Sequence, residues 1–185
     1  MAKSSRVEVK FSGFGGQGIA LMGGILGEAV SLIEEGKNAI MTQNYGPESR
    51  GGASSSDVVL DTKEIDFPLA TEIDHLITMS EEAYIKYIPQ LKKGGILFYD
   101  EGLVKVDDQA KKAKRVLGIP ATKIAESLGN RLYANIVMLG FVCANSDLVS
   151  ESSLISVLKK RIKAVHIPKN LVAFERGKTY KTKDE

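Results

Sequence analysis

Residues 7–19 read VEVKFSGFGGQGI, and the fold class of the chain follows from them. Apolar and charged side chains alternate over residues 7–11, which is the pattern of a β-strand. Glycine-rich residues 13–18 come next, and residues 19–33 place apolar side chains at the three- and four-residue spacing of an amphipathic helix. A strand, a glycine loop and a helix in this order predict an α/β domain of the Rossmann type.

The rest of the chain continues this alternation. Further strands are predicted at residues 38–42, 57–61, 75–79 and 96–99, and helix signals dominate from about residue 120 onward. No internal repeat or linker divides the chain. We therefore expect one Rossmann-like α/β domain over residues 1–185, with a mostly parallel sheet, a helical C-terminal portion and a polar tail at about residues 178–185.

The glycine loop has the spacing of a phosphate-binding turn, because Gly13, Gly15 and Gly18 fit G-x-G-x-x-G. Glycine has no Cβ, so a ligand can approach the backbone, and the free N–H groups at a helix start attract an anion. An NAD or FAD site also needs an acidic residue at the end of the second strand, where this chain has Met41, Thr42 and Gln43. A tight turn without ligand, another phosphate-bearing ligand and a partner surface all stay open.

Two features of the predicted helices need an explanation from packing. Gly23, Gly24 and Gly27 lie inside the first helix, where each glycine costs about 1 kcal/mol relative to alanine. We expect this helix to pack closely on a strand or a neighbouring chain. Asn135 lies in a segment that is otherwise apolar nearly all round, so its amide must find hydrogen-bond partners if it is buried.

A second unusual loop is predicted over residues 44–56, and its residues 45–52 read YGPESRGG. Arg50 can make a bidentate contact with a phosphate or a carboxylate, for which Glu48 is the local competitor. Because the loop follows the second strand, we expect it at the same sheet edge as the glycine loop. A solvated surface loop is the alternative.

Composition excludes several classes of function. With 25 basic and 23 acidic residues the net charge is +2, which gives no basic field for nucleic acid. One cysteine, Cys143, cannot hold an iron–sulfur cluster, and two histidines make a closed zinc site improbable, so we expect no metal on this chain. The longest nearly apolar run, residues 134–144, is far shorter than the ~20 residues of a membrane helix. We expect a cytoplasmic protein that binds neither membrane nor nucleic acid.

The two loops together resemble the gamma subunit of 2-oxoacid:ferredoxin oxidoreductases. The resemblance rests on residues 13–18, 45–52 and 56–58, and residues 65–68, 80–84 and 94–97 continue it in order. It is strong over residues 7–100 and loose beyond them. The sequence of the second loop is more similar to that of 2-oxoglutarate members than to that of pyruvate members. A branched-chain 2-oxoacid member remains an alternative.

The resemblance implies one subunit of an enzyme that oxidatively decarboxylates a 2-oxoacid with coenzyme A. The products would be an acyl-CoA, CO2 and reduced ferredoxin. In this family thiamine diphosphate, Mg and the 4Fe-4S clusters belong to other subunits, so alpha and beta subunits, with a delta subunit in a four-subunit complex, are the expected partners. This chain would have no catalytic residue or metal of its own, and it would be inactive alone.

Our site hypothesis is that the two loops hold coenzyme A phosphates or shape the entrance to the active site. The residues concerned are Gly13, Gly15, Gly16, Gln17, Gly18, Tyr45, Gly46, Pro47, Glu48, Arg50 and Gly51. Two other classes of function stay open. One is a stand-alone nucleotide-binding oxidoreductase of Rossmann type, and the other is an assembly subunit whose glycines serve packing alone.

Overall fold

The computed structural model describes residues 6–44 and 53–182 of the chain. The strands are β1 (Val7–Phe14), β2 (Asn38–Asn44), β3 (Ala53–Asp61), β4 (Ile73–Thr78), β5 (Leu91–Asp100) and β6 (Arg115–Ile119). The α-helices are α1 (Ile19–Ile33), α2 (Glu81–Tyr87), α3 (Ala121–Ser127), α4 (Ala134–Ala144), α5 (Glu151–Arg161) and α6 (Ile167–Lys178). Short 3₁₀ turns are η1 (Ile88–Gln90), η2 (Asp108–Lys112), η3 (Arg131–Tyr133) and η4 (Ala164–His166).

The described strands form one sheet in the order β2-β3-β1-β4-β5-β6. Strands β1, β4, β5 and β6 are parallel neighbours, whereas β3 is antiparallel to both β1 and β2. Within this sheet β3 alone therefore runs against the other strands. The predicted α/β domain with a mostly parallel sheet and a helical C-terminal portion is confirmed.

Strand β3 is longer than the sequence pattern indicates. Residues 53–56, which we predicted as loop, are buried strand residues between β1 and β2. These residues have small, mostly polar side chains, so they lack the alternation of apolar and polar side chains by which a strand is predicted. The hydroxyl of Ser54 donates to the carbonyl of Gly13 at 3.2 Å, so a serine can lie inside the sheet at little cost.

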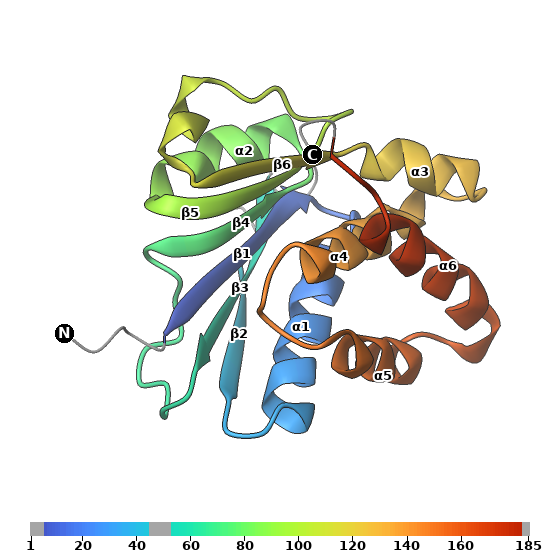
Figure 1. Ribbon diagram of the computed structural model, residues 1–185, viewed down its shortest axis with the longest axis horizontal. Helices are drawn as coiled ribbons and strands as arrows, with labels where there is room; N and C mark the ends of the chain where they lie inside the picture. Colours follow the sequence, from blue (N-terminus) through green and yellow to red (C-terminus); the bar gives the residue numbers. More distant parts are fainter. Residues whose placement is uncertain (1–5, 45–52, 183–185) are drawn as a thin grey trace.

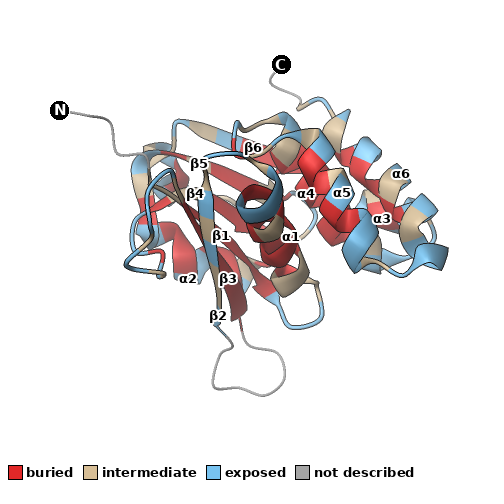
Figure 2. Ribbon diagram, turned by 90° about the horizontal axis from the view of Figure 1, so that it is seen from below, coloured by how far each residue is buried: buried red, intermediate tan, exposed pale blue. Residues whose placement is uncertain are grey.

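Helices cover both faces of the sheet (Figures 1 and 2). Helix α2 lies on one face, while α1 lies on the other together with α4, α5 and α6. A small apolar cluster fills the space under α2, and a larger one lies among the sheet, α1 and the C-terminal helices. Helix α5 packs on α1, whereas α4 contacts the sheet directly, where the ring of Phe141 lies edge-on to that of Phe98 in β5.

Close packing explains one of the three glycines in α1. A β-carbon at Gly23 would collide with Ser56 of β3. One at Gly24 would come within 2.7 Å of the Arg161 guanidinium of α5, which is the end of a flexible side chain and can move aside. A β-carbon at Gly27 would make only ordinary contacts, the nearest at 3.6 Å from Met41. The predicted close approach of α1 to a strand is therefore confirmed at Gly23.

Helix α4 is buried along nearly its whole length, as its composition predicts. It packs on α6, where a β-carbon at Gly140 would collide with the Phe174 carbonyl and one at Gly177 with the Val137 carbonyl.

No helix among the described residues is both long and apolar enough to cross a membrane.

Candidate functional site

The glycine loop connects the end of β1 to the start of α1. Gly16 and Gly18 have φ angles of 92° and 77°, in the left-handed region that glycine adopts without strain. Gly18 is the N-cap of α1, so the helix start has no capping side chain, and its first turn contains no acidic residue. No side chain caps the N–H groups of this turn, and the positive end of the helix dipole favours an anion near them.

Gln17 fixes the shape of this loop. Its side-chain oxygen accepts a hydrogen bond from the Phe14 N–H at 2.6 Å, and its Nε2 donates to the Met79 carbonyl at 2.8 Å. The amide thus links the ends of β1 and β4. We predicted Gln17 as a binding residue, and the structure shows both ends of its amide engaged within the chain.

The glycines divide into two that are packed and two that are open. Gly13 lies against Gln17, Ile19 and Met79, and Gly18 lies against the Asn135 side chain. Apart from the glycine itself and its two chain neighbours, no described residue comes within 4 Å of a β-carbon placed at Gly15 or Gly16. The exposed backbone of the loop, to which a ligand has access, is therefore the Gly15–Gly16 segment.

Two cavities flank this open segment. The Arg131 cavity has a volume of about 260 Å³ and is lined by Gly15, Gly16, Gln17, Met79, Thr122, Arg131, Leu132 and Ala134. The Asn135 cavity has a volume of about 350 Å³ and is lined by Gly16, Gly18, Leu21, Asn130, Leu132, Tyr133, Asn135, Ile162, His166 and Asn170. Gly16 and Leu132 line both, so the loop lies where the two cavities meet.

Two functional candidates in these cavities were not assigned from the sequence. Arg131 is an exposed residue that lines the cavity containing Gly15 and Gly16. Asn135 is only 6% exposed, and its side-chain oxygen has no hydrogen-bond partner among residues 6–44 and 53–182. Both residues reach the loop because η3 and α4 fold back on it, a long-range contact that no local pattern encodes.

The second loop lies mostly outside the described residues. This applies to the predicted site residues Tyr45, Gly46, Pro47, Glu48, Arg50 and Gly51. The described residues on either side lie at the expected place, since Ala53 pairs with Phe14 and Asn44 pairs with Ser55. The flanks of this loop and the glycine loop thus share one edge of the sheet.

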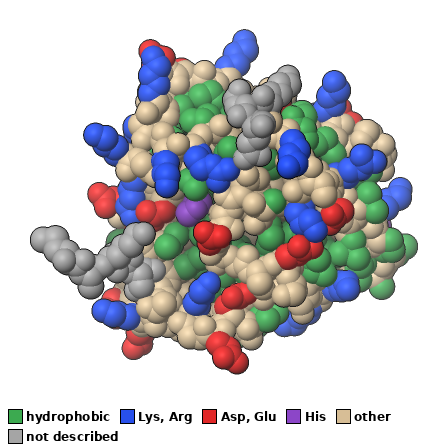
Figure 3. Space-filling model, viewed as in Figure 1, with side chains coloured by type: hydrophobic (Ala, Val, Ile, Leu, Met, Phe, Trp, Pro, Cys, Tyr) green, Lys and Arg blue, Asp and Glu red, His purple; other side chains and the backbone are tan. Residues whose placement is uncertain are grey.

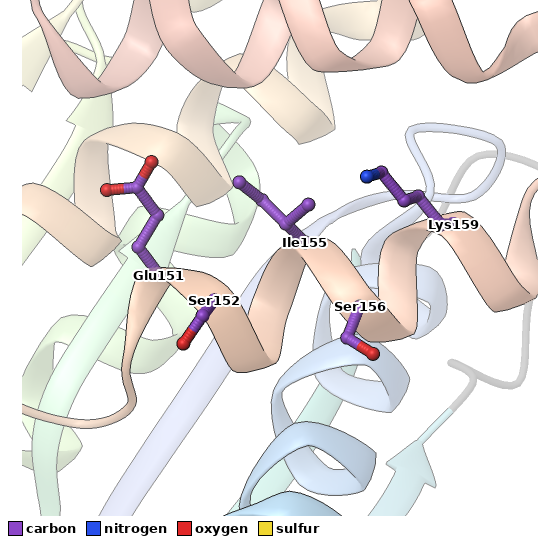
Figure 4. Close-up of a pocket in the computed structure, with 5 residues that line it drawn as sticks. All are labelled: Glu151, Ser152, Ile155, Ser156 and Lys159. Atoms are coloured by element: carbon purple, nitrogen blue, oxygen red, sulfur yellow. The ribbon is translucent and has the colours of Figure 1, made fainter.

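A broader hollow of about 700 Å³ lies along α5, away from the glycine loop. Figure 4 shows Glu151, Ile155 and Lys159 on one side of the helix, with Ser152 and Ser156 pointing the other way. These five lining residues include no part of the glycine loop. The cavities at the loop are therefore the better candidate site.

The described residues offer no site for a metal or a cluster. No group of three or more His, Cys, Asp and Glu side chains among them could hold a metal ion. The half-buried Cys143 is the chain's one thiol, and burial raises its pKa to about 11. An iron–sulfur cluster needs about four thiolates, so these residues do not fit one.

Acidic and basic side chains are mixed over the face seen in Figure 3.

Comparison with known proteins adds to this geometry. Residues 8–180 match the family model described as pyruvate ferredoxin/flavodoxin oxidoreductase. The chain is 43% identical over 173 residues to the 2-oxoglutarate synthase subunit KorC of Methanocaldococcus jannaschii, an alignment that covers 93% of this chain and 92% of KorC.

Two solved structures have similar folds. The gamma subunit of a keto/oxoacid ferredoxin oxidoreductase from Geobacter sulfurreducens superposes with a TM-score of 0.82 at 35% identity, covering 94% of both chains. The 2-oxoglutarate:ferredoxin oxidoreductase of Magnetococcus marinus, solved with 2-oxoglutarate, coenzyme A and succinyl-CoA, also gives 0.82. That likeness covers 95% of this chain and 31% of the other at 23% identity, and it shows a shared fold.

Proposed function

The chain belongs to the pyruvate ferredoxin/flavodoxin oxidoreductase family, and we propose that within it the chain is the gamma subunit of a 2-oxoglutarate:ferredoxin oxidoreductase. The family assignment confirms the resemblance found in the two loops. The choice of 2-oxoglutarate is supported by the similarity to KorC along more than nine-tenths of this chain. The chain is thus a component of an oxidoreductase rather than an enzyme by itself.

The proposed complex converts 2-oxoglutarate, coenzyme A and two oxidised ferredoxins into succinyl-CoA, CO2, two reduced ferredoxins and a proton. We assign thiamine diphosphate with Mg and the 4Fe-4S clusters to the alpha, beta or delta subunits. For the clusters the reason is that one cysteine falls short of the about four thiolates that a cluster needs. The Magnetococcus marinus enzyme, which contains the same fold, was solved with coenzyme A bound.

Within the complex, this chain supplies a phosphate-binding surface for coenzyme A. The observation that carries this role is the open Gly15–Gly16 backbone at the uncapped start of α1, with Arg131 beside it. An anion there meets free N–H groups, the helix dipole and a guanidinium. Gly13, Gln17 and Gly18 shape the loop. Tyr45, Gly46, Pro47, Glu48, Arg50 and Gly51 are proposed from the sequence to complete the site.

A stand-alone NAD or FAD enzyme fits the fold less well. In a dinucleotide site the acidic residue that binds the ribose ends the strand beside β1. Here β3 separates β2 from β1, and β2 ends in Thr42, Gln43 and Asn44 without an acid. The other alternative, a subunit that serves assembly alone, predicts that substitutions in the glycine loop leave coenzyme A kinetics unchanged.

The direct test is anaerobic purification of the tagged chain from its own organism. The complex is assayed by dye reduction with 2-oxoglutarate, pyruvate and 2-oxoisovalerate, each with and without coenzyme A. We expect partner subunits to co-purify and reduction to require 2-oxoglutarate and coenzyme A together. A chain that purifies alone and shows no activity with any of the acids would refute the subunit assignment.

A further inference from the structure

The connection between α5 and α6 concentrates positive charge. Residues 152–174 contain five lysines and arginines and no aspartate or glutamate. The whole chain has a net charge of +2, so the residues outside this segment sum to −3. We call the connection itself, residues 159–169, the basic turn. Figures 1 and 2 both show it at the outer end of the helices, away from the sheet.

Two of the five cations in this segment are bound within the chain, and three remain for a partner. Lys160 and Arg161 both bind Glu28 of α1, each at 2.6 Å, and so fix the basic turn to the first helix. The other three are exposed and form no ion pair among the described residues, and these are Lys159, Lys163 and Lys169. Like charges in so short a stretch repel one another, and an acidic partner would relieve this repulsion.

The basic turn also exposes an apolar side chain. Val165, in η4, is 78% exposed and lies between Lys163 and Lys169 along the chain. Removing its side chain from water would be favourable, so Val165 offers a partner an apolar contact. An apolar centre with a polar, charged rim is the usual composition of a protein docking surface.

The residues of the basic turn that line the Asn135 cavity are different ones. Ile162 and His166 line that cavity, whereas neither Val165 nor any of the three lysines lines it or the Arg131 cavity. The lysines and Val165 therefore lie outside the site proposed for coenzyme A, and their charge has a different ligand to attract.

Ferredoxin is the only protein among the reactants of the proposed reaction. We infer that it docks on the basic turn, with an acidic patch of its own surface against the three lysines and an apolar contact at Val165. The inference rests on the proposed function, since it assigns a surface to the electron acceptor of that reaction. Ferredoxin must arrive and leave at each one-electron step, and opposite charges speed its arrival without requiring a long-lived complex.

Other partners fit the basic turn less well. The centre of a permanent subunit interface is depleted in lysine, whereas lysine is the commonest residue of this turn. Single-stranded nucleic acid stacks on aromatic rings, and residues 159–169 contain no Phe, Tyr or Trp. A membrane surface needs an amphipathic helix that exposes its apolar face, and Leu154, Val157 and Leu158 of α5 are buried.

The test compares two electron acceptors in the intact anaerobic complex, with 2-oxoglutarate and coenzyme A saturating. One is ferredoxin from the same organism, and the other is methyl viologen, a small dye that needs no docking surface. Lys163→Glu combined with Lys169→Glu reverses two charges of the basic turn. We expect kcat/KM for ferredoxin to fall at least about tenfold at low salt, with the rate of dye reduction unchanged. At about 1 M salt, where charges are screened beyond about 3 Å, the difference should disappear.

Two further variants separate the apolar contact from the charge and provide a control. Val165→Ser removes the apolar contact without changing the charge, so the KM for ferredoxin should rise at low and at high salt alike. Lys63→Glu combined with Lys93→Glu is the matched control, because it reverses two exposed charges outside the basic turn. The control should leave kcat/KM for ferredoxin unchanged.

Three outcomes would overturn the inference. An unchanged kcat/KM for ferredoxin in the variant with both lysines of the turn replaced, or an equal fall in the control, would show that the acceptor docks elsewhere. Loss of the partner subunits from that variant would make the turn a subunit interface. A higher KM for coenzyme A with unchanged ferredoxin kinetics would assign the lysines to phosphate groups.

The proposed function is judged separately, in the wild-type complex. It fails if dye reduction there does not require both 2-oxoglutarate and coenzyme A, whatever the ferredoxin kinetics of the variants. It stands if that requirement holds while the substitutions in the basic turn have no effect, and the docking inference alone is then overturned.

Discussion

The side-chain amide of Gln17 donates a hydrogen bond to the backbone carbonyl of Met79, 2.8 Å away, and so ties the glycine loop to the end of the neighbouring parallel strand. The same side chain accepts from the Phe14 N–H at 2.6 Å. The loop is therefore held in shape by the chain itself. A loop fixed in advance loses little conformational entropy when a ligand binds.

Gln17→Leu tests this connection, because it keeps the volume and removes both hydrogen bonds. Two backbone groups then lose their partners, so we expect the free energy of unfolding to fall by about 1–3 kcal/mol. Urea unfolding of the purified chain measures this, with Gln90→Leu on the exposed η1 turn as the control. We also expect the KM for coenzyme A to rise several-fold in the complex. Unchanged stability would show that the loop does not depend on Gln17.

The glycines of α1 offer a matched pair of substitutions. Gly23→Ala puts a methyl group into Ser56, so we expect it to destabilise the chain. Gly27→Ala makes only ordinary contacts at 3.6 and 3.8 Å, and alanine favours a helix interior over glycine by about 1 kcal/mol. It should therefore stabilise. Thermal unfolding of both variants decides the point, and equal shifts in the same direction would contradict the packing described for α1.

The stability of the chain should depend on pH through His75. Its Nδ1 is buried without a partner among the described residues, and burial lowers its pKa, although Asp74 and Asp147 oppose the shift. The unfolded chain then takes up a proton that the folded chain resists. Stability should be complete above pH 6.5 and decline as the pH falls from there towards the lower pKa of the folded state.

Unfolding of the wild type and of His75→Phe across this pH window checks the prediction. The variant should lose the part of the pH dependence that lies just below 6.5, and the exposed His166→Gln should retain it. A wild type whose stability rises as the pH falls through this window would show that the sign is wrong.

Cys143 should react slowly with alkylating agents. Burial raises its pKa to about 11, Glu151 adds to the shift, and Lys178 opposes it. A free thiol has a pKa of about 8.5, so at pH 8 the thiolate fraction here should be lower by roughly two orders of magnitude. Iodoacetamide labelling followed by mass spectrometry measures the rate, which should climb steeply towards pH 11. A rate at pH 8 like that of a free peptide thiol would disprove the shielding of this residue.

The sequence predicts the parts of the fold that depend on local pattern. The first strand, the glycine turn and α1 follow from alternation, missing side chains and helical spacing. Ser80 caps α2, where its hydroxyl accepts a hydrogen bond from the Ala83 N–H and two acidic residues follow in the first turn. These signals come from residues that are close in sequence, and the interactions between such residues do not depend on the rest of the chain.

Contacts between residues that lie far apart in the sequence could not be predicted from local pattern. The insertion of β3 between β1 and β2 depends on buried serines that look like loop residues. Arg131 and Asn135 reach the glycine loop only through the fold of η3 and α4. For Asn135 the sequence did contain a signal, since an amide in an apolar helix demands an explanation. The structure confirms its burial and shows that its oxygen is unpaired among described residues.

The most direct measurement is the KM for coenzyme A in complexes carrying Gly15→Asp or Gly15→Asn. Both side chains enter the same open space and have nearly the same shape, but Asp is charged whereas Asn is neutral and can donate a hydrogen bond. A carboxylate about 4 Å from a phosphate near the protein surface is repelled by up to about 4 kcal/mol. We expect a KM for coenzyme A at least tenfold higher with Asp than with Asn, and equal KM values for 2-oxoglutarate. Equal KM values for coenzyme A in the two variants would contradict a phosphate site at this loop.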